Sequence, residues 1–365
     1  MITHKTIVHV VGARPNFMKV APVMDALHGE SRIRQLLVNT GQHYDESMAG
    51  SFLKELQLPT PDRDLGVGSA SHAVQTAKVM IAFEEICLEE RPDLVVVVGD
   101  VNSTMAASLV AAKLVIPIAH VEAGLRSRDK YMPEEVNRIV TDRLADLLLT
   151  PSRDADENLR AEGTPEERIH FVGNVMIDTL RRHLPMATLE RIRGRLSVVD
   201  TPYAVLTLHR PSNVDHRETF GSILAAVRQV AAKMPVVFPV HPRSRNRLRE
   251  FGLEDGLDGV VLTEPLGYID FLALTSHASL ILTDSGGLQE ESTALGIPCL
   301  TLRENTERPV TVSNGTNRVV GTKTEDIVGG VEEALGSTAP KRIPELWDGH
   351  AADRVAAVLT RFLFE

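Results

Sequence analysis

The sequence predicts an α/β protein with two doubly wound domains, each built around a parallel sheet, on three observations. Short runs rich in Val, Ile and Leu alternate with longer segments of helical spacing, and this alternation occurs twice along the chain. Most runs are apolar on consecutive residues, as expected for central parallel strands that are covered on both faces. The length of 365 residues suits two domains of ordinary size.

Each half of the chain supplies its own set of expected strands. In the first half these are 5–12 (KTIVHVVG), 34–41, 93–100, 116–124 and 168–174. In the second half they are 203–210 (YAVLTLHR), 235–241, 260–265, 280–287 and 297–302.

Helical spacing fills the segments between these runs. Val74, Ala77 and Ile81 show it within 72–86. A charged helical connector over 174–202 separates the halves, and the last residues, 348–365, form an amphipathic helix that could pack on either domain.

Composition and charge exclude some classes of protein. The net charge of −10 repels nucleic acid. No apolar stretch approaches the roughly 20 residues that span a bilayer, and the N-terminus lacks the apolar core of a signal peptide. Cys87 and Cys299 lie in apolar stretches, which favours buried thiols over a disulfide. We therefore expect a cytoplasmic protein with no membrane or nucleic-acid partner.

Ligands of doubly wound sheets bind beyond the carboxyl ends of the strands, so polar residues directly after an apolar run are functional candidates. Arg14 and Lys19 follow the first run, where the start of a helix favours a bound anion. The other candidates at run ends are Asp100, Ser103, Thr104, His120, Glu122, Arg126, His209, Arg210, His241, Asp284 and Ser285.

Several of these residues also have a purely structural interpretation. Asp100 precedes Asn-Ser-Thr and could be a loop or capping aspartate. His120 lies inside an apolar run, which favours a hydrogen-bonded structural histidine over a catalytic one. Glu134 and Glu135 follow a proline at a helix start, where the helix dipole favours acidic residues in any case.

The segment DSGGLQEE, 284–291, is a stronger signal for anion binding. A strand, two glycines and a helix start form a cradle of backbone N–H groups, although a simple tight turn has the same residues. The segment has neither the lysine of a P-loop nor the spacing of G-x-G-x-x-G. Without zinc-type ligand spacing elsewhere, the pattern points to acid/base chemistry beside a bound anion.

Nine motifs in chain order resemble those of one family. They are GARPNFMK, TGQHYD, VVGDVNST, HVEAGLRS, MPEEVNR, HRPSN, EPLGYIDF, TDSGGLQEE and NTERPVT. The set is similar to that of the non-hydrolysing UDP-N-acetylglucosamine (UDP-GlcNAc) 2-epimerases, and the match runs nearly end to end. The resemblance implies a glycosyltransferase-B-type fold of two Rossmann-like domains facing a cleft. The expected domains are 1–174, with a helix 351–365 crossing back onto it, and 175–350, which binds UDP.

The resemblance also assigns roles position by position. Asp100, Glu122 and Glu134 match the acid/base carboxylates of the family, and Lys19 is expected to hold one of them ionised. His209 matches a histidine beside the diphosphate that we count among the catalytic residues. The remaining expected substrate contacts are Arg14 and Arg308 as cations, Ser285, Gly286, Gly287 and Glu291 at the diphosphate and ribose, and Phe271 near the uracil.

The activity implied is reversible inversion at C2 of UDP-GlcNAc to UDP-N-acetylmannosamine (UDP-ManNAc), a precursor of envelope polysaccharides, by a homodimer without cofactor or metal. Loss of UDP to a 2-acetamidoglucal and its re-addition is the expected route, because breaking the C1–O bond acidifies the C2–H bond. Alternatives are epimerisation of another UDP-acetamido sugar such as a diacetamido uronic acid, a hydrolysing relative, a glycosyltransferase of the same fold, and a non-catalytic sensor of sugar nucleotides.

Two motifs depart from the common family pattern. Members activated allosterically by UDP-GlcNAc carry a QHRxML-like stretch where this chain has Gln42, His43, Tyr44 and Asp45. We therefore do not expect the same activation here. The segment HRPSN replaces the commoner HRREN, which keeps the histidine and arginine but changes their neighbours.

Overall fold

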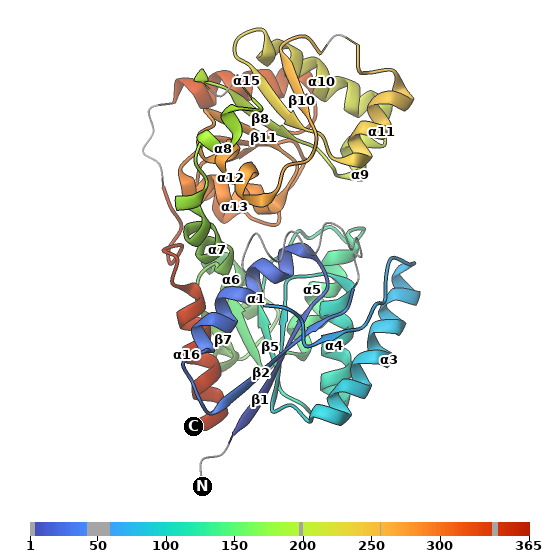
Figure 1. Ribbon diagram of the computed structural model, residues 1–365, viewed down its shortest axis with the longest axis vertical. Helices are drawn as coiled ribbons and strands as arrows, with labels where there is room; N and C mark the ends of the chain where they lie inside the picture. The colour runs from blue at the N-terminus through green and yellow to red at the C-terminus, as the bar shows by residue number, and fades with distance from the viewer. Residues whose placement is uncertain (1–3, 42–58, 197–199, 256, 338–341) are drawn as a thin grey trace. The chain divides into compact units, whose positions relative to one another are not determined.

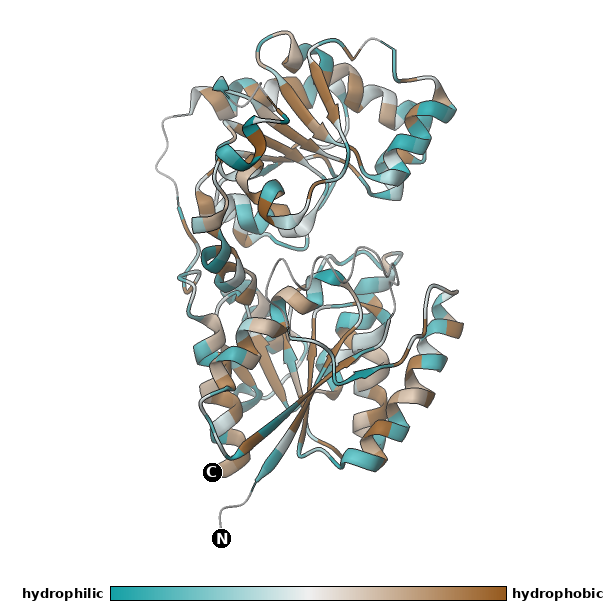
Figure 2. Ribbon diagram, viewed as in Figure 1, coloured by the Kyte–Doolittle hydropathy of each residue, from teal (hydrophilic) through white to brown (hydrophobic). Residues whose placement is uncertain are grey.

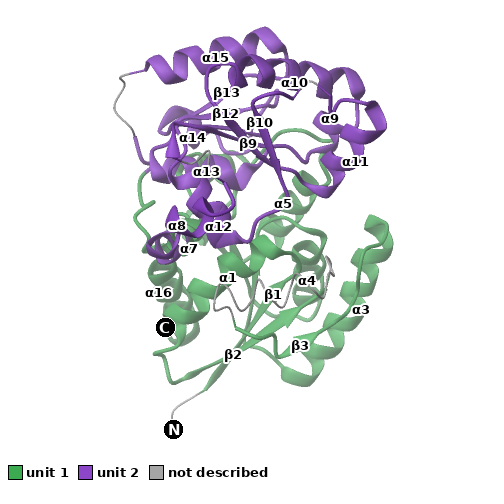
Figure 3. Cartoon of the chain, turned by 45° about the horizontal axis from the view of Figure 1, so that its top comes forward, with its two compact units in different colours: residues 1–179, 345–365 green, residues 180–344 purple. Residues whose placement is uncertain are grey.

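The chain divides into two compact units in a computed structural model that describes residues 4–41, 59–196, 200–255, 257–337 and 342–365 (Figure 3). Unit 1 comprises Met1–Thr179 and Glu345–Glu365, and unit 2 comprises Leu180–Pro344. The chain passes from unit 1 to unit 2 inside the helix α7 (Val175–His183).

Unit 1 contains a parallel sheet that, over the described residues, has seven strands in the order β3-β2-β1-β4-β5-β6-β7. This is the order of a Rossmann-type sheet with one strand added at the edge. The strands are β1 (Lys5–Val11), β2 (Ile33–Asn39), β3 (Arg63–Asp64), β4 (Leu94–Val98), β5 (Ile118–Val121), β6 (Leu147–Thr150) and β7 (Ile169–Phe171).

Helices cover both faces of this sheet (Figure 1). They are α1 (Arg14–Leu27), α3 (His72–Glu90), α4 (Asn102–Lys113), α5 (Pro133–Leu144), α6 (Arg153–Ala161), the short 3-10 helix η1 (Glu166–Arg168), the first part of α7, and α16 (Ala351–Phe364). Side chains from α3 and α4 pack with Val8, Val95 and Val97 in one core. The C-terminal helix α16 packs beside α1 within the same unit (Figure 1).

The strands at the centre of the sheet are apolar on both faces. All five residues of β4 are fully buried, which explains their consecutive Leu and Val side chains. Figure 2 shows hydrophobic colouring along most of the strands of both units.

The predicted helix over 72–86 is present as α3, but its buried face differs from the one the spacing indicated. Val74 and Ile81 are exposed, with 47% and 66% of their surface accessible. The buried face instead runs through Val79 and Phe83, and Phe83 packs in the core with the strand residues Val95 and Val97.

Unit 2 repeats the same architecture with a six-stranded parallel sheet over the described residues, in the order β10-β9-β8-β11-β12-β13. The strands are β8 (Ala204–Thr207), β9 (Val236–Pro239), β10 (Val260–Thr263), β11 (Leu280–Thr283), β12 (Cys299–Thr301) and β13 (Asn317–Val319). The helical segments are η2 (Leu184–Met186), α8 (Glu190–Arg193), α9 (Pro211–Val214), α10 (Arg217–Ala231), α11 (Pro242–Phe251), α12 (Tyr268–Ser276), α13 (Gly286–Leu295), α14 (Val310–Ser313) and α15 (Thr324–Gly336).

The predicted fold class of two doubly wound, Rossmann-like α/β domains is confirmed, and each expected strand overlaps an observed one. Three observed strands, β3, β6 and β13, were not among the expected ones. Both cysteines are buried and unpaired. Within the described ranges, no helix combines the length and apolar character required to cross a bilayer.

Candidate active site

The carboxyl edge of the unit 1 sheet collects the candidate residues of the first half of the chain. In the sheet, β2 lies on one side of β1 and β4 lies on the other side. The chain therefore leaves β1 in one direction toward β2 and later returns to the opposite side of β1 as β4. The carboxyl ends of β1 and β4 therefore lie at the switch point where doubly wound sheets bind ligands. Lys19 follows β1, Asp100 follows β4 and Glu122 follows β5.

Lys19 and Glu122 form a buried ion pair at this switch point. The backbone of Gly99 lies against both side chains: a Cβ added there would be 3.2 Å from Nζ of Lys19 and 3.4 Å from Oε2 of Glu122. Gly99 also has a φ of +67°, which a residue with a side chain rarely adopts. The ion pair thus lies directly beside the residue that precedes Asp100.

The first turn of α1 is fixed to the end of β4 by Asn16. Its side-chain oxygen accepts hydrogen bonds from the backbone N–H groups of Gly12 and Ala13, and its amide donates to the carbonyl of Val98. Arg14, the first residue of α1, is exposed at this same edge.

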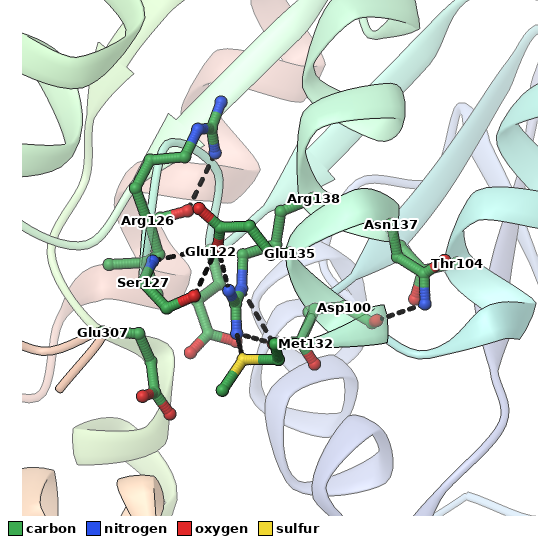
Figure 4. A network of polar contacts seen from close by, with 12 residues as sticks. Asp100, Thr104, Glu122, Arg126, Ser127, Met132, Glu135, Asn137, Arg138 and Glu307 are labelled. Carbon is green, nitrogen blue, oxygen red and sulfur yellow. Dashed lines mark hydrogen bonds and ion pairs between the residues drawn. The ribbon is translucent and has the colours of Figure 1, made fainter. Parts of the chain in front are cut away.

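Asp100 is held by Arg138 from α5 (Figure 4). An Nη atom of Arg138 lies 2.8 Å from Oδ2 of Asp100, and the other lies 2.5 Å from Oε2 of Glu135. The Asn137 amide donates to the backbone carbonyl of Asp100. Arg138 is buried and the Asp100 carboxylate is partly exposed, so the cation orients a carboxylate that a ligand can still reach.

The adjacent residues Glu134 and Glu135 have different surroundings, which the sequence could not separate. Glu135 is buried and accepts hydrogen bonds from the backbone N–H groups of Ser127 and Arg128. Burial acts to raise the pKa of Glu135, but these hydrogen bonds and the charge of Arg138 outweigh it and hold the pKa below its usual range. Glu135 therefore anchors the loop after β5, whereas Glu134 is half-buried in the first turn of α5.

The backbone at Glu122 is strained. Its φ of +71° is unusual for a residue with a long side chain. The N–H groups of Glu122 and Ala123 both donate to the carbonyl of Leu149, which holds this conformation. Strain of this kind concentrates at functional sites.

In unit 2, His209 follows β8 and is oriented by Asp284, which follows β11. The Nδ1 atom of His209 lies 2.8 Å from Oδ1 of Asp284, and the backbone N–H groups of His209 and Arg210 also donate to this carboxylate. Burial opposes ionisation of Asp284, but its hydrogen bond to His209 and the attraction between them hold its pKa below the usual range. Nδ1 is then the donor to Asp284, and Nε2 is left for another partner.

The helix α13 begins at Gly286, with Ser285 as its N-cap. A Cβ at Gly286 would lie 2.8 Å from Oε1 of Glu307, whereas a Cβ at Gly287 would meet no heavy atom within 4 Å. Glu307 is buried and paired with Arg303 at 2.8 Å and Arg210 at 3.3 Å. Burial opposes its ionisation, but these cations and Arg308 hold its pKa well below the usual range. The start of α13 therefore lies beside a cluster of arginines.

Two adjacent glutamates on α13 differ in their partners. Glu290 is ion-paired with Arg308, with 2.7 Å between Oε1 and Nε. Glu291 accepts a hydrogen bond from the hydroxyl of Tyr268 at 3.1 Å. Burial raises the pKa of Glu291 to about 7, the Tyr268 hydrogen bond acts against this, and the charge of Glu290 adds to it.

A pocket of unit 2 opens beside His209 and Ser285. Phe271 of α12 and His241, the N-cap of α11, contribute to its wall. The other lining residues are Thr207, Leu208, Pro239, Pro265, Leu266 and Leu288. The wall combines an aromatic ring with polar groups at strand ends, which suits a ligand that has a flat ring and an anionic part.

Each unit thus brings together its own candidates. In unit 1, Lys19 and Glu122 are paired beside Gly99, the residue before Asp100, and in unit 2 His209, Phe271 and Ser285 line one pocket. Within the described ranges, no group of three or more His, Cys, Asp or Glu side chains could hold a metal ion. Gln42, His43, Tyr44 and Asp45 lie outside the described residues.

The sequence did not identify several residues that hold the candidates in place. These are Arg138, Asp142, Tyr268, Arg303 and Glu307. The spacing of Glu135 and Arg138 was a signal for a helical ion pair. Nothing local showed that Arg138 also reaches Asp100, because the two lie on different elements.

Comparisons with known proteins agree on one family. A model of the family described as "UDP-N-acetylglucosamine 2-epimerase" matches residues 25–360. A Methanocaldococcus jannaschii protein of that name is 42% identical over 359 residues, covering 96% of this chain and 98% of the relative. A Pseudomonas aeruginosa protein named UDP-2,3-diacetamido-2,3-dideoxy-D-glucuronate 2-epimerase is 37% identical, covering 97% of this chain and 99% of the relative.

The structure is similar to solved structures of the same kind. The crystal structure of the M. jannaschii UDP-GlcNAc 2-epimerase in complex with UDP-GlcNAc and UDP superposes with a TM-score of 0.90 at 41% identity. The match covers 98% of this chain and 99% of that one.

Proposed function

This chain belongs to the UDP-N-acetylglucosamine 2-epimerase family of isomerases, and on that premise we propose that it interconverts UDP-GlcNAc and UDP-ManNAc. The proposal draws support from the complex of the M. jannaschii enzyme with UDP-GlcNAc and UDP. It draws further support from the carboxylates and cations at the carboxyl edges of both sheets.

The UDP part of the substrate is bound by unit 2. Phe271 contacts the uracil, Glu291 the ribose, and Ser285, Gly286 and Gly287 donate to the diphosphate from the start of α13. His209 and Arg308 supply the polar and positive groups for the diphosphate. The pocket beside His209, Ser285 and Phe271 supports this assignment.

Epimerisation proceeds by elimination and re-addition. The C1–O bond breaks with its electron pair going to the UDP oxygen, and the C2 proton passes to a carboxylate, which leaves a C1–C2 double bond. UDP then adds back to C1 while a proton is delivered to C2 from the opposite face. Negative charge grows on the diphosphate as it departs, so cations and N–H donors there lower the barrier.

Asp100, Glu122 and Glu134 are the groups that exchange the C2 proton. Removal and delivery on opposite faces of the ring require two differently placed groups, or one group and an intermediate that turns between the two steps. Lys19 holds the Glu122 carboxylate and Arg138 orients that of Asp100. The observation that carries the proposal is the meeting of Lys19, Glu122 and the Gly99–Asp100 turn at the switch point of the sheet.

The test is to incubate the purified protein with UDP-GlcNAc alone and to follow the sugar by NMR. We expect UDP-ManNAc to accumulate to an equilibrium mixture that is also reached from UDP-ManNAc. Free N-acetylmannosamine would indicate hydrolysis. No reaction without an acceptor would indicate a glycosyltransferase or a sensor, and either result would overturn the proposal.

A second substrate is tested in parallel because of the P. aeruginosa relative. That protein is named for a diacetamido glucuronate sugar and is 37% identical to this chain. If this chain prefers such a sugar, the corresponding UDP-diacetamido uronate will be epimerised with a higher kcat/KM than UDP-GlcNAc. The nucleotide contacts proposed above are the same for both substrates.

We further propose that the protein acts as a homodimer, as the family resemblance implies. Val74, Ile81 and Leu88 repeat every seven residues along one exposed face of α3, and Val136 and Ile139 are exposed on α5. A second copy would remove these apolar side chains from water. Light scattering coupled to size-exclusion chromatography is expected to give twice the chain mass of 40.0 kDa. A single-chain mass would contradict the proposal.

A further inference from the structure

His120 is on β5, two residues before Glu122, and its ring is completely buried. Nδ1 is 2.6 Å from Oδ1 of Asp142, which is on α5. Nε2 is 2.8 Å from the backbone carbonyl oxygen of Gly99. Both ring nitrogens are therefore at hydrogen-bonding distance from an oxygen.

Both of these oxygens act as acceptors. A carbonyl oxygen has no proton to donate. The second carboxylate oxygen of Asp142, Oδ2, accepts from the guanidinium of Arg126 at 2.7 Å and from the N–H of Gly124 at 3.1 Å. Burial opposes ionisation of Asp142, but its hydrogen bonds and the charge of Arg126 outweigh it and hold its pKa below the usual range. Each ring nitrogen of His120 therefore faces an acceptor oxygen.

The two partners of His120 belong to the segments that present the proposed catalytic carboxylates. Gly99 immediately precedes Asp100, and its backbone lies against the Lys19–Glu122 ion pair. Asp142 binds the N–H of Gly124, two residues after Glu122. One buried histidine ring and its partner Asp142 therefore join the turn after β4 to the loop after β5.

We propose that His120 is a positioning residue, whose ring ties the Gly99 carbonyl to Asp142 and so sets the separation of the Asp100 and Glu122 carboxylates for proton exchange at C2. This inference rests on the proposed function. Its physical basis is the sensitivity of proton transfer to geometry: a displacement of about 1 Å can cost on the order of 100-fold in rate.

Three variants separate the two contacts of the ring. His120→Leu removes both contacts. His120→Gln places an amide N–H near the position of Nε2, where it can still donate to Gly99, and His120→Asn places one near Nδ1, where it can donate to Asp142. We expect kcat to fall about 100-fold in His120→Leu. His120→Gln is expected to regain part of this loss, while KM and the affinity for UDP stay unchanged in all three variants.

His9 provides a matched control for loss of a buried histidine. It lies on β1 of the same sheet, is also completely buried, and its ring contacts the side chain of Gln35 rather than a catalytic segment. His9→Leu is expected to lower thermal stability as much as His120→Leu but to keep the wild-type kcat. If both variants lose kcat equally, or if His120→Leu keeps the wild-type value, the proposal is wrong.

A second measurement does not depend on activity. Crystal structures of the wild type and of His120→Leu are expected to differ by about 1 Å in the separation of the Asp100 and Glu122 carboxylates. An unchanged separation would overturn the inference even if the wild-type protein epimerises UDP-GlcNAc. Failure of the wild type to epimerise would instead overturn the proposed function alone.

Discussion

The ammonium group of Lys19 on α1 is ion-paired with the carboxylate of Glu122, which follows β5, and both side chains are buried. Each charge is removed from water, and the attraction between the two charges compensates part of that cost. The pair therefore fixes a carboxylate beside Asp100 at the cost of making unit 1 sensitive to loss of either partner.

Removing the cation alone is expected to be worse than removing both charges. Lys19→Met removes the cation that is paired with the buried Glu122 carboxylate, and we expect it to lose activity and about 3–5 kcal/mol of stability. The double variant Lys19→Met/Glu122→Gln is expected to recover most of the stability but no activity. Thermal denaturation and an epimerase assay of both variants check this. Equal stabilities for the single and double variants would contradict the coupling.

Asp100→Asn is expected to abolish turnover while UDP binding is retained. The amide keeps the shape of the side chain but cannot take up a proton, and loss of such a group typically costs about 100- to 10,000-fold. The measurements are kcat for epimerisation and the dissociation constant of UDP by calorimetry. A near-normal kcat would remove Asp100 from the proposed chemistry.

The stability of unit 2 is expected to depend on pH through Glu291. Its pKa is raised by burial to about 7 from the ordinary 4.5. Between these values the folded chain holds a proton that the unfolded chain has lost, so stability falls as the pH rises through this window. Glu291→Gln stays neutral and is expected to be more stable than the wild type at pH 8, by on the order of 3 kcal/mol, with little difference near pH 4.5.

Thermal denaturation of both proteins at the two pH values measures this effect. Tyr268→Phe is the companion variant, because it removes the hydrogen bond that favours the ionised form. It should move the pH midpoint of the effect upward. Parallel pH profiles for the wild type and Glu291→Gln would contradict the assignment.

Gly286→Ala is expected to displace the buried carboxylate of Glu307, because the new methyl group would lie 2.8 Å from its Oε1 atom. Such overpacking typically costs about 1–3 kcal/mol. Gly287→Ala meets open space and is expected to keep or raise thermal stability. The loss in Gly286→Ala should shrink in a Glu307→Ala background, since the clash is then absent, and an undiminished loss would refute it.

Much of the fold could be predicted from the sequence because buried parallel strands have a strong local signature. The run Leu94–Val98 is apolar throughout, and such runs alternate with helices in both halves. The three strands that the sequence did not predict, β3, β6 and β13, lack such a long apolar run. β3 has two exposed residues, β13 begins with Asn317 and Arg318, and β6 is a short run separated from α5 by only two residues. Edge pairing with neighbouring strands, rather than local composition, makes β3 and β13 strands.

The candidate site could be predicted only in part, for a similar reason. Lys19, Asp100 and Glu122 were found because each follows a strand, and parallel strands end at the same edge of a sheet. Their pairing with particular cations is a tertiary property. Arg138 reaches Asp100 from α5, and Asp142 reaches His120 from the same helix, at separations that no local pattern reports.

Hydrogen exchange at C2 tests the central proposal most directly. The protein is incubated with UDP-GlcNAc in D2O, and the isotope at C2 of newly formed UDP-ManNAc is read by NMR and mass spectrometry. Elimination followed by protonation from the opposite face predicts deuterium at C2 of the product from the first turnovers. Epimer that retains its original hydrogen at C2 would contradict proton exchange by Asp100, Glu122 and Glu134.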